Sequence, residues 1–235
     1  MVLPWVPPIR VQLTPPSEAL LTFAVACGGA PFSAHPPGLI DSPPPLWYVN
    51  DHEEAIGQGR AEFVRAGDAL RRLDCLQLEW LRATVQGDVL AICSRQFGVL
   101  WLMNANRLLP KAASAASGTD CVAMSWGTTA RHVRAPRDPH ARSHTLTHPR
   151  ALTRPHAPGL PALRPSVPSR SQVLAGEERL SVRWDRESDA VLFRVRSYSR
   201  PRHAFGLLGY PVVRLQQRRF ARDAAQAMRR ACTER

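Results

Sequence analysis

Residues 174–228 carry the most regular alternation of hydrophobic and polar positions in the chain. Over 180–184, Leu, Val and Trp alternate with Ser and Arg, which is the two-residue period of a strand with one buried face. The same period returns over 191–195, and the polar stretch 185–189 between the two runs is typical of a turn. These segments predict an antiparallel hairpin that ends near Pro201, because proline has no N–H to donate to a neighbouring strand.

A long helix is predicted after this hairpin. Beyond Gly209 the hydrophobic period changes to that of a helix of about five turns, and Pro211 is tolerated in the first turn, where an N–H has no partner in any case. A helical projection places five apolar residues on one narrow face: Val213, Phe220, Ala224, Ala227 and Ala231. Four arginines fall on the opposite side, which we interpret as a solvated outer face: Arg214, Arg218, Arg222 and Arg229.

The folded region upstream is expected to begin near Trp47. An amphipathic helix is predicted from Gly59 to near Asp74, with Phe, Ala and Leu recurring at spacings of three and four. Strands are then predicted over 76–80, 89–93, 99–103 and 121–127, with a loop over 112–118. Helix, antiparallel strands and C-terminal helix together indicate an α+β fold, in which an antiparallel sheet packs on a long C-terminal helix.

The first 45 residues read as a disordered leader or a targeting segment. They hold 11 of the 22 prolines and show no sustained periodicity. The apolar run over 19–27 is too short to span a bilayer, which takes about 20 residues. Because Glu18 directly precedes this run, a secretory signal peptide is disfavoured, and an organellar transit peptide or a mispredicted start are the alternatives.

The net charge of +12 does not predict specific nucleic-acid binding. The segment 134–172 holds seven arginines against one acid, so half of the excess comes from one proline-rich tract without aromatic residues. Such a tract neutralises phosphates but offers no stacking platform for bases.

No metal site, cofactor site or disulfide framework is predicted. The five cysteines are widely spaced without any CxxC motif, which favours reduced thiols in the cytosol or a plastid. His140, His144 and His148 recur every four residues, but intervening prolines prevent the helix that would place them on one side. We attribute these histidines to codon bias rather than to metal binding.

Several blocks in a fixed order resemble one protein family. They are VNDHEEAIGQGRAEFVRAGDALRRLDCLQLEW at 49–80, SWGTT at 125–129, LAGEERLSV at 174–182, SYSRPRHAFGLLGYP at 197–211 and QQRRFARDAAQAM at 216–228. The chain is similar to the domain-of-unknown-function nineteen-ninety family of plants and actinobacteria, and most similar to its plant-type members. The resemblance implies a compact α+β domain of the helix-grip, START-like class, in which a curved sheet wraps a long helix around an apolar cavity.

The resemblance covers 46–132 and 173–235 as two halves of one domain, separated by an insertion at 133–172. The insertion is 40 residues long, so its removal keeps the reading frame, and its first and last codons are compatible with intron boundaries. We interpret it as a retained intron. A disordered insertion between two strands is the alternative, and sequencing the transcript distinguishes the two.

Candidate ligand-binding residues lie in the blocks that carry the resemblance. They are Trp126, Thr128, His132, Glu178, Arg196, Ser199 and Arg200. Glu177 and Glu178 are adjacent on a predicted strand and must face opposite sides, so at most one of them enters a cavity. The sequence shows no catalytic residue, since it lacks a nucleophile elbow and a paired acid and base.

Three functions therefore stay open. A non-catalytic module that binds a small apolar or lipid-like ligand ranks first. Association with the plastid outer envelope, at its surface or as part of a channel, is the second, and it follows from plant-type relatives. An enzyme on a helix-grip scaffold is the third. The sequence does not indicate an oligomeric state.

Overall fold

A computed structural model describes most of the chain outside the insertion. The described residues are 10–11, 17–34, 36–96, 98, 100–110, 119–129, 174–201 and 204–233. The predicted loop over 112–118, His132 and the histidines of the insertion lie outside them.

One antiparallel sheet organises the fold. Its strands lie in the order β2-β8-β7-β6-β5-β4-β3, and the short β1 pairs with β5. The strands are β1 (Arg10–Val11), β2 (Tyr48–Gln58), β3 (Leu81–Gln86), β4 (Val89–Gln96), β5 (Leu100–Leu108), β6 (Thr119–Thr128), β7 (Leu174–Asp185) and β8 (Ala190–Pro201). The helices are α1 (Ser17–Ala26), α2 (Gly59–Arg71), the 3₁₀ turn η1 (Asp74–Leu76) and α3 (Ala204–Thr233).

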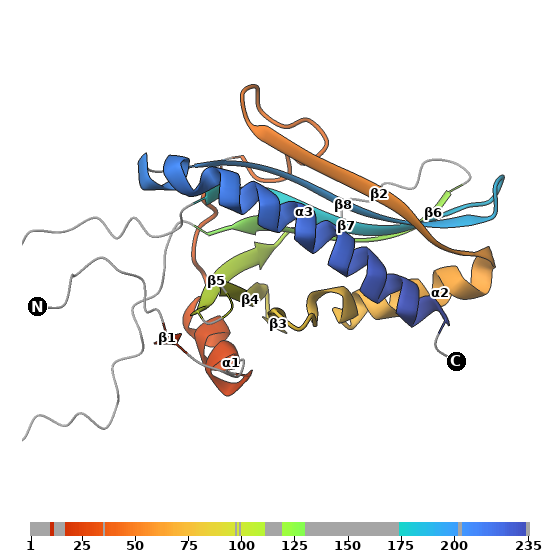
Figure 1. The fold of residues 1–235 in the computed structure, drawn as a ribbon, viewed down its shortest axis with the longest axis horizontal. Coiled ribbons are helices and arrows are strands. Elements are labelled where there is room, and N and C mark those ends of the chain that lie inside the picture. Colours follow the sequence, from red (N-terminus) through yellow and green to blue (C-terminus); the bar gives the residue numbers. More distant parts are fainter. Residues whose placement is uncertain are drawn as a thin grey trace, which may run out of the picture.

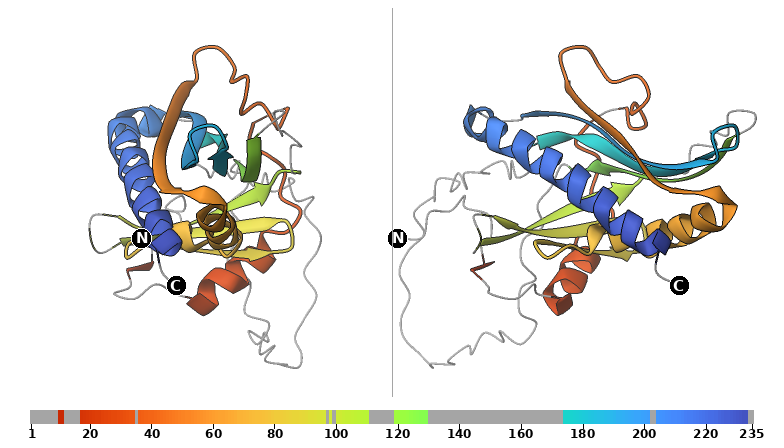
Figure 2. Two further views of the ribbon diagram at one scale, coloured as in Figure 1. Left: turned by 90° about the vertical axis from the view of Figure 1, so that its right-hand side faces the viewer. Right: turned by 45° about the vertical axis from the view of Figure 1, so that its right-hand side comes forward.

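The sheet curves around α3, which crosses one of its faces diagonally (Figures 1 and 2). We call this the helix face of the sheet and the opposite one the outer face. Helix α2 and η1 lie near the C-terminal half of α3, whereas α1 packs on the outer face against β3, β4 and β5. The predicted α+β plan is confirmed, and a curved antiparallel sheet holding a long C-terminal helix is a helix-grip arrangement.

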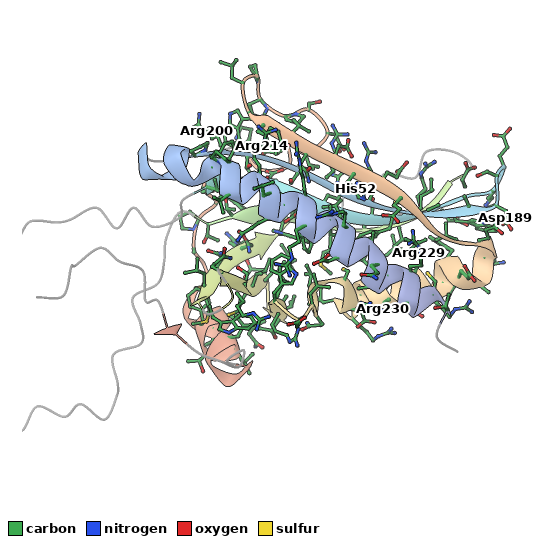
Figure 3. The ribbon with its side chains drawn as sticks, in the orientation of Figure 1. His52, Asp189, Arg200, Arg214, Arg229 and Arg230 are labelled. Atoms are coloured by element: carbon green, nitrogen blue, oxygen red, sulfur yellow. The ribbon has the colours of Figure 1, made fainter. Side chains whose placement is uncertain are left out.

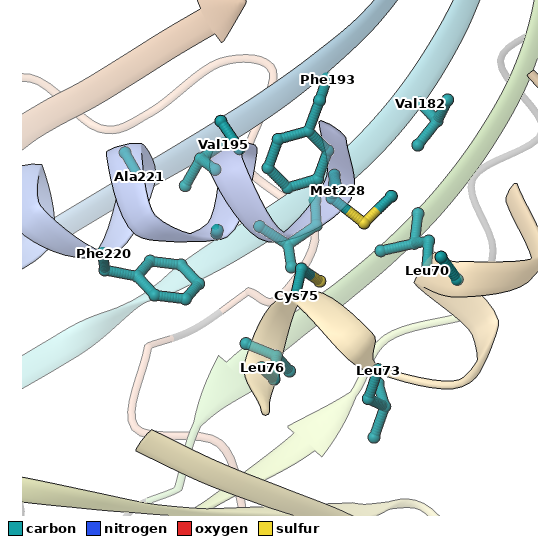
Figure 4. Close-up of a cluster of buried hydrophobic side chains, with 14 of the residues drawn as sticks. Leu70, Leu73, Cys75, Leu76, Val182, Phe193, Val195, Phe220, Ala221 and Met228 are labelled. Carbon is teal, nitrogen blue, oxygen red and sulfur yellow. The ribbon is translucent and has the colours of Figure 1, made fainter. Parts of the chain in front are cut away.

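The main core lies between the helix face and the C-terminal half of α3. Val182 and Phe193 from the β7–β8 hairpin meet Met228 of α3 and Leu70 of α2, and all four are fully buried (Figure 4). The side chains of α3 at this contact are mostly small, so the helix approaches the strands closely. They are Phe220, Ala221, Ala224, Ala225, Met228 and Cys232.

The buried stripe of α3 is rotated relative to the predicted one. Phe220 and Ala224 are buried as expected, but Ala227 and Ala231 are only partly buried. The helix also begins at Ala204, so that Pro211 lies within it rather than in its first turn. The predicted apolar face left out Ala221, Ala225 and Met228, which are all buried.

Near the start of the domain, one strand prediction is wrong and one strand was not predicted. The segment 76–80 contains the end of η1 and an isolated bridge from Leu78 to Leu81, and the strand begins only at Leu81. Leu73 adopts a left-handed backbone with φ of 65°, which turns the chain between α2 and η1. Conversely, β2 was missed by periodicity, because this edge strand carries acidic side chains on both faces.

Part of the leader forms a helix that packs on the sheet. Ser17–Ala26 form α1, whose Leu20 and Ala24 are buried with Cys27 against the outer face. Their partners include Trp101 of β5, which is also buried. The apolar run that is too short for a bilayer covers an apolar patch of the sheet instead.

The insertion joins two neighbouring strands. Gly127 of β6 pairs with Glu177 of β7, so the two strand ends that flank the insertion lie side by side. Strands from both sides of the insertion thus share one continuous sheet.

Truncating Phe193 tests the core. Phe193 is fully buried between the sheet and α3, so Phe193→Ala is expected to lower the free energy of unfolding by about 3–5 kcal/mol. Leu215 on the exposed side of α3 is the control, and Leu215→Ala is expected to change stability by less than about 0.5 kcal/mol. Urea denaturation followed by circular dichroism measures both, and equal losses would contradict this packing.

Deleting 133–172 tests whether the fold depends on the insertion. The deletion leaves five residues, 129–132 and 173, to connect β6 to β7, which is enough for a hairpin loop. The shorter loop is expected to raise the free energy of unfolding by up to about 2 kcal/mol through its smaller closure entropy. A deletion variant that unfolds at lower denaturant than the full chain would show that the insertion supports the fold.

Candidate functional site

The contact between the sheet and α3 is divided into an apolar and a polar half. Along the helix face of β8, Val191, Phe193 and Val195 are followed by Ser197 and Ser199. Along α3, the buried apolar stripe ends at Phe220, and three partly buried polar residues before it contact Tyr48 or Ser199 of the sheet. They are Tyr210, Arg214 and Gln217, at spacings of four and three residues on one face of the helix.

Ser199 connects the two elements of this polar half. The Tyr210 hydroxyl donates to the Ser199 carbonyl oxygen at 3.1 Å and lies 3.3 Å from its Oγ. Gln217 Nε2 donates to the same Oγ at 3.5 Å. Tyr48, which pairs with Ser199, packs its ring edgewise against Tyr210 at 6.1 Å and lies 4.0 Å below the guanidinium of Arg214. Figure 3 shows Arg214 on the first half of α3.

Three buried polar atoms of the polar half lack a hydrogen-bond partner. They are Ser197 Oγ, Gln217 Oε1 and Arg214 Nε. Ser197 is only 5% exposed, so water outside the protein does not replace a partner. Buried polar groups are nearly always paired in native proteins, and their concentration between one strand and one helix distinguishes this region from the apolar half.

Glu178 belongs to the same surface. It pairs with Trp126 of β6 on one side and Ser197 of β8 on the other, and residues directly opposite each other share a face of the sheet. Burial raises the pKa of Glu178 to about 7. Burial is likewise the main cause that raises the pKa of the nearby Cys75 thiol to about 12, and the negative charges of Asp74 and Glu178 add to it.

Glu177 faces the other way, as strand alternation requires. Its carboxylate accepts a hydrogen bond from the Gly38 amide at 2.6 Å on the outer face. Burial also raises the pKa of Glu177, and that hydrogen bond opposes the rise. Glu177 thus binds the leader segment to the sheet, and only Glu178 faces α3.

The structure gathers three of the seven sequence candidates. Trp126, Glu178 and Ser199 lie on the helix face of the sheet. His132 lies outside the described residues. The other three candidates are elsewhere, and each has structural contacts of its own.

Arg196 and Arg200 lie on the outer face of β8. Arg196 donates to the Ile40 carbonyl at 3.1 Å and pairs with Asp51 at 3.3 Å. Arg200 is exposed and stacks on the Trp47 ring at 4.5 Å. Both arginines therefore fasten the segment before β2 to the sheet.

Thr128 closes the end of β6. Its Oγ1 accepts a hydrogen bond from the Gly176 amide at 3.0 Å and bonds to the Ser33 hydroxyl. These contacts join β6, β7 and the leader segment.

Sequence reasoning missed Ser197, Tyr210, Arg214 and Gln217. Arg214 was grouped with the solvated arginines, and the structure corrects this, because its Nε is buried against the sheet. Arg218, Arg222 and Arg229 are exposed, as predicted. The sequence did contain a signal for the three residues of α3. The spacing of Tyr210, Arg214 and Gln217 continues the buried stripe of the same helix.

An open depression of about 570 Å³ lies over the C-terminal half of α3. Its lining residues are Glu54, Arg219, Arg222, Asp223, Gln226 and Arg229. Arg229 (Figure 3) pairs with Glu54 beside His52. Arg219 pairs with Asp223 and stacks on Trp80. Two of its three arginines are thus already neutralised, and it includes none of the polar-half residues.

The described residues give no sign of a metal centre or a membrane span. No group of three or more His, Cys, Asp or Glu side chains in this part of the chain is placed to hold a metal ion. Within the same residues, none of the helices has an apolar stretch long enough to cross a bilayer.

Replacing Glu178 tests its burial. Its folded pKa of about 7 exceeds its ordinary value of 4.5, so the native state retains a proton that the unfolded chain releases between these two values. Stability is therefore lost as the pH rises through this window. At about pH 8, Glu178→Gln is expected to be more stable than the native chain by up to about 3 kcal/mol, and near pH 4.5 the two should agree.

Denaturant titrations at both pH values measure this difference, and Glu187→Gln in the exposed β7–β8 turn is the control. Because all other groups are common to the native and variant chains, their titration cancels in the comparison. A Glu178→Gln difference that does not change with pH would show that Glu178 is solvated.

Comparison with known proteins places the chain in a family. The sequence model of a domain of unknown function (DUF1990) matches residues 34–136 and 172–227. A UPF0548 protein of Arabidopsis thaliana is 41% identical over 56 residues, which span 24% of this chain and 27% of the length of that relative.

Three solved structures are similar at low identity. The structure of Ara h 8.0201 has a TM-score of 0.39 and 5% identity over 77% of this chain and 97% of its own. Human STARD10 has a TM-score of 0.37 and 10% identity over 95% and 82% of the two chains. A hypothetical protein of Helicobacter pylori has a TM-score of 0.37 and 9% identity over 76% and 84%.

None of these likenesses reaches a TM-score of 0.5, so the fold assignment rests on the sheet order and the position of α3. The family match does not depend on them, because the two matched segments cover well over half of the sequence. The chain belongs to the DUF1990 family, as a plant-type member.

Proposed function

We propose that this protein is a binding module that takes a small, largely apolar ligand between the sheet and the first half of α3. The observation that carries the proposal is the set of buried, unpartnered polar atoms on Ser197, Arg214 and Gln217. Leaving such atoms without a hydrogen bond costs about 1–3 kcal/mol each, and a ligand with one polar end would offset this cost.

A row of residues across the helix face suggests how the ligand would lie. Ser197, Glu178, Trp126 and Leu108 are successive cross-strand neighbours on β8, β7, β6 and β5. At the usual strand spacing the row spans about 14 Å, from a polar end at Ser197 to an apolar end at Leu108. Leu108 and Ile92 are only partly buried, although they face the core, so they are available to an apolar chain.

Within this proposal Glu178 orients the ligand. Its raised pKa has burial as its sole cause, so no second carboxylate or histidine among the described residues perturbs it. A carboxyl group in these surroundings is protonated below about pH 7 and then donates a hydrogen bond to the polar end of a ligand. This role requires no chemical step.

Native mass spectrometry tests the proposal. The full chain, purified from a lipid-containing host, is expected to carry an adduct that organic solvent extracts. Ser197→Leu fills the polar end of the row and removes a hydroxyl, so this variant is expected to lose the adduct. Ser181→Leu is the control, because Ser181 pairs with Arg194 on the outer face of the same hairpin.

Circular dichroism first establishes that both variants are folded. An adduct retained equally by both variants would place the ligand elsewhere. A native chain that carries no adduct and binds no added amphiphile would refute the proposal.

A further inference from the structure

Arg214 is a cation without an acidic partner at the edge of the proposed site. Its guanidinium stacks on Tyr48 at 4.0 Å, and its Nε is buried without a hydrogen-bond acceptor. Within the described ranges, none of the ion pairs of the structure includes Arg214. By contrast, Arg194 and Arg229 each pair with an acid of β2.

The acids near Arg214 do not balance its charge. On β2, Asp51 is bound by Arg194 and Arg196, and Glu54 is bound by Arg229. Glu178 is the remaining acid of the polar half, and burial alone determines its raised pKa, without any contribution from Arg214. A partly buried guanidinium without a counter-charge is unfavourable, so the site lacks one negative group.

The groups around Arg214 are those that bind anionic oxygens. Gln217 lies three residues further along α3 on the same face, and the hydroxyl of Ser197 faces the helix from β8. The guanidinium and the Ser197 hydroxyl offer N–H and O–H donors on one side, whereas Gln217 Nε2 already donates to Ser199 Oγ and Gln217 Oε1 is an acceptor. Guanidinium groups match carboxylate and phosphate oxygens in geometry and charge.

We infer that the ligand carries an anionic oxygen head group, a carboxylate or a phosphate, which pairs with Arg214 and accepts a hydrogen bond from Ser197. This inference rests on the proposed function and specifies the chemical class of the ligand. The apolar part of the ligand then follows the row past Glu178 and Trp126 toward Leu108.

Titration calorimetry on the full chain tests the head group with ligands of one tail length. The probes are dodecanoate and dodecyl phosphate below their micelle concentrations, dodecanol below its solubility limit, and inorganic phosphate without a tail. The anionic amphiphiles are expected to bind at least about ten-fold more tightly than dodecanol, as for a buried charge pair. If only dodecanoate or only dodecyl phosphate binds this tightly, that probe identifies the head group as carboxylate or phosphate. Inorganic phosphate is expected to bind far more weakly, because it lacks the tail.

Two arginine variants assign the effect to Arg214. Arg214→Met is expected to weaken the binding of the anionic amphiphiles at least about ten-fold and to leave dodecanol binding unchanged. Arg218→Met is the matched control, since Arg218 lies one turn further along α3 and is exposed. Arg214→Lys keeps the charge and is expected to restore part of the affinity. This variant still tests the inference if the methionine variant folds poorly.

Each contrary result has a distinct meaning. Dodecanol binding as tightly as dodecanoate and dodecyl phosphate would overturn the anionic head group and leave the proposed function standing. Equal losses in the Arg214 and Arg218 variants would show attraction to surface charge and would also overturn the inference. A chain that binds none of the amphiphiles would refute both the inference and the proposed function.

Discussion

The close packing of α3 on the β7–β8 hairpin is the contact on which the rest of the structure depends. Phe193 and Val195 of β8 meet alanines of α3, and the small side chains allow the helix to lie directly on the strands. Because a helix is stiff, fixing its C-terminal half also fixes the distance of its first half from the sheet. The polar residues of that half are therefore positioned by an apolar contact further along the same helix.

This arrangement explains how the protein accommodates unpaired polar groups. Leaving Ser197, Arg214 and Gln217 with unpartnered buried atoms lowers stability by a few kcal/mol in total, which is a large fraction of the net stability of a domain. The apolar half, where Val182, Phe193 and Met228 are fully buried, offsets this loss. One helix thus carries both the stabilising contact and the residues of the candidate site.

The alternation of β7 and β8 was strong enough to predict the hairpin, the opposite orientation of Glu177 and Glu178, and the location of the sheet under the C-terminal helix. It failed for β2, because acidic side chains occupy both faces of this edge strand and no two-residue period marks it. Its pairing with β8 is a long-range contact that the local sequence does not show. Arg214 was misplaced because the predicted apolar face left out Ala221, Ala225 and Met228, and including these buried residues turns the inward side of α3 toward Arg214. Propensity could not reveal α1 as part of the fold, since its role depends on an apolar patch formed by strands far along the chain.

The difference between Glu177 and Glu178 shows how one short motif serves both faces of the sheet. Gly176 precedes them, and a Cβ atom at this position would collide with the carbonyl oxygen of Tyr198 on β8. Without that atom the two strands stay in register through the following residues, so Glu177 reaches the Gly38 amide on the outer face. The same register places Glu178 between Trp126 and Ser197 on the helix face. The leader segment and the candidate site are therefore coupled through adjacent residues of β7. A shift of one residue in the pairing of β7 would turn Glu177 to the helix face and Glu178 to the outer face.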